Sequence, residues 1–215
     1  MRHPTRRSNQ AGELGAVWIY RGAAWALRYR WLPPVRHTAA LAFVSAHMKT
    51  EQGHLSVMDA LTAEPRHPAS HIMPRRRTLL DPLWRVAGWL LGAVPCLVGG
   101  DLALYRTVAH VERFVQTHYD EQIAWLAHEI ERGADEKRLN APTADIWLSS
   151  STDRDSMKEL LILLRSFCAD ETEHRLDAES RAPPLPTGAG ALLDSLWGRV
   201  VGAGSVAAVQ ASKWI

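Results

Sequence analysis

Two short motifs in this sequence pair a carboxylate with an imidazole at a spacing that suits metal binding. Glu51 and His54 form one E-x-x-H motif, and Glu171 and His174 form another. Residues three apart lie on the same face of a helix, so the two side chains of each motif can bind one metal ion. The motifs therefore predict two metal-binding helices.

E-x-x-H is short enough to occur by chance, so its surroundings decide its value. A third match, Glu64 to His67, contains Pro65 in a segment without helical periodicity, and we interpret it as chance. The other two motifs lie on apolar helix faces, where an unpaired carboxylate costs several kcal/mol. Simple solvation of a charged helix face does not explain carboxylates at these positions.

Two further carboxylates, Glu13 and Glu112, each stand alone on an apolar helix face. Along the chain a single glutamate is followed by E-x-x-H, and this order occurs twice, with a polar segment after Arg132 lengthening the second interval. Four-helix proteins with a di-iron carboxylate site take their ligands in this pattern. Four carboxylates offset the charge of two Fe²⁺, and hard oxygen ligands suit iron or manganese.

The apolar periodicity predicts an all-α fold, a ferritin-like four-helix bundle in one domain spanning 1–215. Proline pairs and polar, breaker-rich segments separate the elements. The expected helices are 11–31, 35–63, 101–132, one starting at Thr152 or Asp153, and a last one over 190–214, with a surface connection at 64–80 and a polar insertion at about 133–152.

The most apolar segment, Leu79 to Val98, predicts an additional helical hairpin. Its uncharged run between Arg85 and Asp101 is shorter than the ~20 residues that span a bilayer, and prolines and glycines interrupt it. Trp84 and Trp89 within it, beside the basic cluster at 75–77, are typical of a membrane interface. The alternative is a hairpin buried against the bundle.

Composition limits the other partners and the compartment. The net charge is +2, from 25 basic and 23 acidic residues, so we expect no nucleic-acid partner. The only cysteines, Cys96 and Cys168, form no zinc or disulfide framework and predict a reducing compartment. The basic leader MRHPTRRSNQ precedes no apolar signal region, which favours a bacterial or already mature chain.

The strings AGELGAVWIY, LLDPLWRVAGWLLGA, VERFVQTHYDEQI and DETEH resemble the demethoxyubiquinone hydroxylase family of ubiquinone biosynthesis, over most of residues 10 to 212. The resemblance implies a ferritin-like di-iron monooxygenase. It implies that six residues, each matching a ligand position of the family, bind the metal: Glu13, Glu51, His54, Glu112, Glu171 and His174.

The resemblance also implies a chemistry. Two Fe²⁺ ions activate O₂ and one oxygen atom enters the ring of a polyprenyl quinone or quinol. The reductant stays open, with NADH as one candidate. His118 and Tyr119 match a His-Tyr pair near the family's site, although Tyr119 also fits a core tyrosine with a bonded hydroxyl. His47, four residues before Glu51, has an expected supporting or surface role.

A polyprenyl substrate implies a peripheral enzyme at the cytoplasmic face of a bacterial inner membrane, with accessory proteins of ubiquinone biosynthesis as possible partners and an oligomeric state that the sequence leaves open. The sequence departs from the family in three places. Arg113 replaces a common second Glu, the connections at 62–80 and 133–156 are long, and Asp81 precedes the PLW segment. These departures leave the exact quinone open.

Two other functions remain open at this point. One is a ferritin-like oxidase or peroxidase that does not act on a quinone, which the apolar Trp-rich segment disfavours. The other is a non-catalytic protein that binds quinone or lipid, which six intact ligand positions disfavour.

Overall fold

The computed structural model describes residues 6–29, 37–63, 79–139, 148–182, 185 and 187–214. Within these residues the regular structure is helical: α1 (Arg6–Tyr29), α2 (Thr38–Ala63), α3 (Asp81–Leu139), α4 (Leu148–Arg181) and α5 (Ala189–Trp214). The predicted all-α fold is confirmed. Glu64, His67 and the basic cluster at 75–77 lie outside the described residues.

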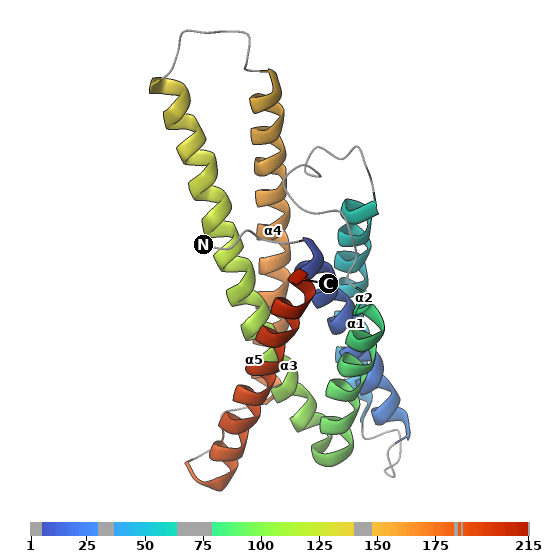
Figure 1. Cartoon of the computed structure of the whole chain (residues 1–215). Helices are drawn as coiled ribbons and strands as arrows, with labels where there is room; N and C mark the ends of the chain where they lie inside the picture. The colour runs from blue at the N-terminus through green and yellow to red at the C-terminus, as the bar shows by residue number, and fades with distance from the viewer. Residues whose placement is uncertain are drawn as a thin grey trace.

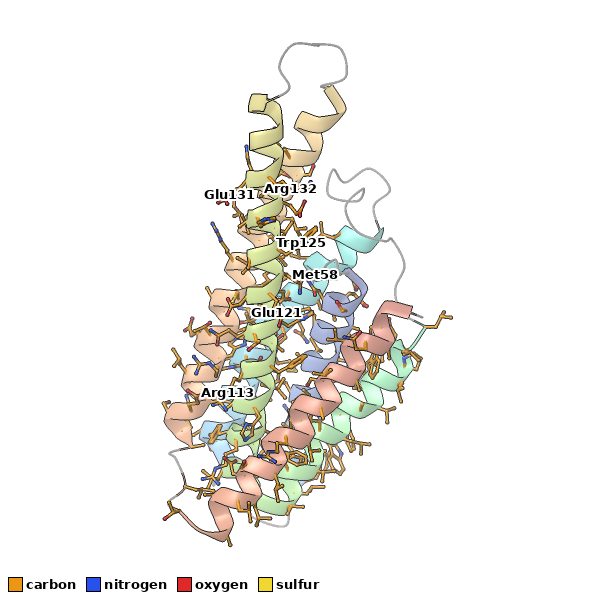
Figure 2. The ribbon with its side chains drawn as sticks, turned by 60° about the vertical axis from the view of Figure 1, so that its left-hand side comes forward. Met58, Arg113, Glu121, Trp125, Glu131 and Arg132 are labelled. Atoms are coloured by element: carbon orange, nitrogen blue, oxygen red, sulfur yellow. The ribbon has the colours of Figure 1, made fainter. Side chains whose placement is uncertain are left out.

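The bundle consists of α1, α2, α4 and the part of α3 that follows Gly100 (Figure 1). Its buried apolar side chains form two clusters. One, around Tyr20, Leu27 and Leu104, joins α1, α2 and α3. The other, around Leu126 and Leu164, joins α3 and α4 to the last part of α2, and Met58 and Trp125 belong to it (Figure 2). The candidate ligands lie on the same helices between these clusters.

The apolar hairpin exists, but its turn lies at Gly100 and not within the predicted segment 79–98. Gly100 has φ 69° and ψ −150°, a conformation that glycine adopts without steric cost. Residues 81–99 form one helical arm, which continues through Pro95, and the chain then reverses into the long arm of α3 (Figure 1). Asp101, at the start of the long arm, lies 2.5 Å from His37 Nδ1.

The arm 81–99 contacts α1 backbone to backbone. A Cβ atom on Gly92 would lie 1.9 Å from the carbonyl oxygen of Ile19, and one on Gly22 would lie 2.0 Å from that of Trp89. Only glycine permits such an approach. The contact fixes the position of α1, which carries Glu13.

The described parts of the polar insertion predicted at about 133–152 are helical. α3 continues to Leu139 and α4 begins at Leu148, while 140–147 lie outside the described residues. The two helices project together beyond the rest of the bundle (Figures 1 and 2). Arg154 of α4 donates a hydrogen bond to the carbonyl oxygen of Ile130 of α3 at 3.0 Å. Contact between the two helices therefore stabilises helical structure in a segment whose local composition predicted a loop.

α5 packs against α1 and α3, and it leaves large apolar side chains exposed. The arm 81–99 does the same. The exposed residues are Leu83, Val86, Leu90, Val94, Leu97 and Val98 on the arm, and Leu192, Leu193, Leu196, Val200 and Val206 on α5. By length and composition alone, α3 and α5 each contain a segment apolar enough to cross a membrane, a property that core helices of soluble proteins share.

Candidate metal centre

The six predicted ligands converge in the interior of the bundle. Glu13 comes from α1, Glu51 and His54 from α2, Glu112 from α3, and Glu171 and His174 from α4. Each is at most 5% exposed. Burying four carboxylates together is costly unless cations compensate their charge.

The side chains form two overlapping groups. Glu13, Glu51, His54 and Glu171 offer ligand atoms within 4.8 Å of one another, and so do Glu51, Glu112, Glu171 and His174. Glu51 and Glu171 belong to both groups. Two neighbouring candidate cation positions therefore share two carboxylates, and each has one further carboxylate and one imidazole.

Both imidazoles direct Nδ1 into the cluster. His54 Nδ1 lies 3.3 Å from Glu171 Oε1, and His174 Nδ1 lies 3.0 Å from Glu51 Oε1. The other nitrogen of His54, Nε2, lies 3.0 Å from Asp170 Oδ2. A carboxylate on the outer nitrogen fixes the orientation of a metal-binding histidine and makes it a stronger ligand.

Several inward-facing atoms of the described residues make no well-oriented hydrogen bond, although some of them lie 3.0–3.5 Å from one another. They are Glu13 Oε2, both carboxylate oxygens of Glu51, Glu171 Oε2, His54 Nδ1 and His174 Nδ1. Buried polar atoms rarely lack partners, and an exception needs an explanation. All of these atoms are of types that bind iron or manganese, so the residues fit a pair of such ions.

In the absence of metal, the pKa values of Glu51, Glu112 and His54 are all shifted upward, which favours protonation of the cluster. Burial, followed by repulsion from Glu171, raises the pKa of Glu51 and of Glu112 well above the usual range. Burial lowers the pKa of His54, but the adjacent carboxylates of Glu13 and Glu171 outweigh it and raise that pKa to about 11. Protons on these groups supply the charge that a metal pair would supply.

Two tyrosines hydrogen-bond to the unshared carboxylates. The hydroxyl of Tyr119 on α3 donates to Glu13 Oε1 on α1, and the hydroxyl of Tyr20 on α1 donates to Glu112 Oε1 on α3 at 3.1 Å. The structure thus places Tyr119 at the cluster. Sequence reasoning missed Tyr20 as a site residue, although Tyr20 follows Glu13 by seven residues just as Tyr119 follows Glu112.

His118 lies outside both ligand groups. It lines a small cavity of about 40 Å³ whose wall also includes Glu13, Glu112 and Tyr119. Its ring is parallel to that of Phe114, with the centroids 6.1 Å apart. His118 is therefore near the cluster, at the cavity and not among the ligand atoms.

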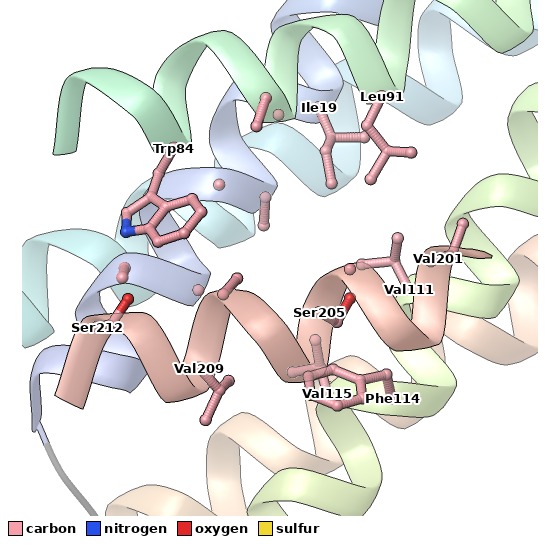
Figure 3. Close-up of a pocket in the computed structure, with 18 of the residues that line it drawn as sticks. Ile19, Trp84, Leu91, Val111, Phe114, Val115, Val201, Ser205, Val209 and Ser212 are labelled. Carbon is pink, nitrogen blue, oxygen red and sulfur yellow. The ribbon is translucent and has the colours of Figure 1, made fainter. Parts of the chain in front are cut away.

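A larger apolar cavity of about 340 Å³ lies between α1, both arms of α3, and α5 (Figure 3). Trp84, Leu91, Val201 and other apolar residues line it. It shares wall residues with the small cavity: Ser8, Gly12, Ala16, Phe114, Val115 and Val209. An apolar surface thus leads from α5 to the buried carboxylates, a feature that depends on tertiary packing and carries no motif in the sequence.

Comparison with known proteins identifies the family of this chain. The sequence model of a family described as ubiquinone biosynthesis protein COQ7 matches residues 4–212. The chain belongs to this family. The resemblance seen in the sequence is thereby confirmed.

Relatives in the COQ7 family carry names of hydroxylases. The 3-demethoxyubiquinol 3-hydroxylase of Rhodospirillum rubrum is 32% identical over 190 residues, covering 86% of this chain and 69% of that protein. The mitochondrial NADPH-dependent 3-demethoxyubiquinone 3-hydroxylase of Mus musculus is 30% identical over 210 residues, covering 96% and 75%. The mitochondrial 5-demethoxyubiquinone hydroxylase of Saccharomyces cerevisiae is 28% identical over 171 residues, covering 78% and 59%.

Arg113, which the resemblance marks as a departure from the family pattern, lies on the surface of α3 (Figure 2). Its guanidinium donates to Glu179 Oε1 of α4 at 2.7 Å, and Glu179 also accepts from Arg175 at 2.8 Å. Arg113 therefore forms an ion pair between α3 and α4, while its neighbour Glu112 lies within the cluster.

Proposed function

We propose that this protein is a di-iron monooxygenase that hydroxylates the ring of a demethoxyubiquinone-type polyprenyl quinone or quinol. The observation that carries the proposal is the pair of overlapping ligand groups that share Glu51 and Glu171. Membership of the COQ7 family and the hydroxylase names of the relatives support the substrate class.

Glu13 and His54 would hold one iron ion, Glu112 and His174 would hold the other, and Glu51 and Glu171 would contribute to both positions. A pair of ferrous ions bound there would supply the O₂ activation that amino-acid side chains alone do not provide. The protein itself contributes a buried site that excludes bulk water and a set of carboxylates that neutralises the metal charge.

The apolar cavity suits the substrate. Its wall is built from small and branched apolar residues of α1, α3 and α5, which match a polyprenyl chain better than a polar ligand. The quinone ring would lie where this cavity meets the small one, between Phe114 and Val115 on one side and Gly12 and Ala16 on the other. A ring at this place faces Glu13 and Tyr119.

His118 and Tyr119 would act on the substrate side of the centre. Both residues line the small cavity, and the Tyr119 hydroxyl donates a hydrogen bond to Glu13. Burial, followed by the charge of Glu13, raises the pKa of Tyr119 well above the usual range, so the hydroxyl keeps its proton at neutral pH. Tyr119 would thereby orient Glu13, and His118 would contact the ring.

The exposed apolar residues of the arm 81–99 and of α5 would bind the surface of the membrane that contains the substrate. These same two elements line the larger cavity, through Trp84, Gly88 and Leu91 on the arm and Val201 and Val209 on α5. A polyprenyl chain could therefore pass from the bilayer to the cavity without crossing water. The cytoplasmic face of a bacterial inner membrane remains the expected location.

A turnover experiment tests the proposed function. The protein is loaded anaerobically with Fe²⁺ and mixed with a short-chain demethoxyubiquinone, isotopically labelled O₂ and either NADH or NADPH. The account predicts one labelled oxygen atom on the ring of the product. Oxygen consumption with an unmodified quinone would favour the oxidase alternative.

A further inference from the structure

The candidate metal centre has two halves that repeat one another. In each half a tyrosine donates to the unshared glutamate of the opposite helix, Tyr20 to Glu112 and Tyr119 to Glu13. Each tyrosine lies seven residues after the glutamate of its own helix. The repeat seen in the ligands therefore includes their hydrogen-bond partners.

The repeat extends to an aromatic ring in each half, four residues before the shared glutamate. His47 precedes Glu51, and its ring lies on that of His174 with the centroids 4.2 Å apart. Phe167 precedes Glu171, and its ring lies on that of His54 with the centroids 3.9 Å apart.

Each of these rings also contacts the tyrosine of its half. The ring centroids of Tyr20 and His47 are 5.9 Å apart, and those of Tyr119 and Phe167 are 6.3 Å apart. The two halves differ in one respect, since Phe167 offers no polar atom whereas His47 Nδ1 lies 3.4 Å from the Tyr20 hydroxyl.

The hydrogen bond of His47 Nε2 determines whether the other ring nitrogen, Nδ1, can accept a hydrogen bond from Tyr20. Nε2 lies 3.0 Å from Asp177 Oδ2, and Asp177 also accepts from Arg181 at 2.8 Å. A carboxylate only accepts, so Nε2 carries the hydrogen. In the tautomer with the hydrogen on Nε2, Nδ1 presents a lone pair toward the Tyr20 hydroxyl.

The Tyr20 hydroxyl therefore has one hydrogen and two acceptors, Glu112 Oε1 at 3.1 Å and His47 Nδ1 at 3.4 Å. A buried hydroxyl that loses its acceptor is destabilised by about 1–3 kcal/mol. If Glu112 turns Oε1 to a metal ion, Tyr20 can donate to His47 and avoid that cost. In the other half Phe167 cannot replace Glu13 as the acceptor for Tyr119.

We propose that His47 is a positioning residue that allows Glu112 to exchange its hydrogen bond with Tyr20 for a metal ion, while Glu13 keeps its hydrogen bond with Tyr119. The inference rests on the metal pair proposed above. Its consequence is an unequal centre, in which the Glu112 carboxylate changes orientation and the Glu13 carboxylate does not.

A double-mutant cycle with Co²⁺ as the probe tests this role without requiring turnover. Binding of Co²⁺ is followed by visible absorption in the wild type, His47→Phe, Tyr20→Phe and the double variant. His47→Phe keeps a ring on His174 and removes the acceptor, so one of the two binding steps should weaken about tenfold. In Tyr20→Phe the hydroxyl is gone, and His47→Phe should cause no further loss.

The conservative variant His47→Gln retains an acceptor oxygen, so we expect it to restore most of the Co²⁺ affinity. His47→Leu, which also lacks an acceptor, replaces His47→Phe if that variant does not fold. Unchanged affinity in His47→Phe, or an equal loss with and without the Tyr20 hydroxyl, overturns the role of His47. A wild type that binds fewer than two Co²⁺ ions contradicts the proposed centre itself, which separates the two failures.

Discussion

Glu51 and Glu171 contribute to both candidate cation positions, whereas Glu13, Glu112, His54 and His174 each contribute to one. This division has an energetic basis. A carboxylate between two cations compensates charge at both, so its loss affects the whole pair, while loss of an unshared ligand affects mainly one position. Individual substitutions should therefore have graded effects on metal content.

We expect Glu112→Ala to bind about one iron ion per chain and Glu51→Ala to bind fewer, against two in the wild type. Both variants should remain folded, because each removes a buried carboxylate that is destabilising without metal. Metal analysis after anaerobic Fe²⁺ loading measures the content, and circular dichroism checks the fold. Equal metal content in the two variants would contradict the shared role of Glu51.

Asp170 gives a second test at the residue scale. Removing the carboxylate that accepts from His54 Nε2 frees the ring to reorient, so Asp170→Ala should weaken binding of one metal ion about 10- to 100-fold. Glu173→Ala, three residues along α4 and exposed, is the matched control and should bind metal as the wild type does. Titration with Co²⁺ compares the two, and similar losses in both would argue for a general effect of surface charge.

The arm 81–99 and α5 are the elements that distinguish this structure from a bare four-helix bundle. The arm lies on α1 through glycine contacts, and α5 covers the cavity from the other side. Both elements carry exposed leucines and valines on their outer faces. The position of the arm is therefore fixed by backbone contact with α1, and in our account the outer faces of both elements contact the membrane.

Packing at the glycine contact is directly testable. Gly92→Ala places a Cβ atom against the carbonyl oxygen of Ile19, so the arm must shift, at a cost of about 1–3 kcal/mol in the free energy of unfolding. Gly202→Ala on α5 meets no atom within 4 Å and should be neutral or stabilise the helix by up to ~1 kcal/mol. Urea denaturation compares both variants with the wild type, and equal stability of the two would show that the arm is not in backbone contact.

The exposed faces predict membrane binding through the arm. Replacing Leu90 and Val94 together with Asp puts two charges on this face, and we expect a large reduction in co-sedimentation with anionic liposomes. Ile162→Asp on α4, where the exposed fraction is 68%, is the control for loss of surface hydrophobicity and should sediment as the wild type does. Retained sedimentation of the double variant would remove the arm from the interface.

For the whole molecule, the periodicity and the repeated ligand order predicted the all-α bundle and the convergence of all six candidate ligands. Helix periodicity shows which residues lie on the apolar, buried face of a helix, and a carboxylate on that face needs a compensating cation. These inferences therefore use only local sequence. The turn at Gly100, the helical continuation to Leu139, and the cavity under α5 escaped prediction. Each depends on contacts between segments distant in the chain, which override local propensity.

The central claim is that this protein hydroxylates a quinone precursor at the metal centre. It is tested most directly by quinone profiling with mass spectrometry in a strain that lacks the gene. Wild-type protein should restore the hydroxylated quinone, and Glu112→Ala, produced at the same level, should leave the unhydroxylated precursor to accumulate as it does in the deletion strain. Normal quinone levels with Glu112→Ala, together with loss of iron from the purified variant, would contradict the hydroxylase account and favour a binding role.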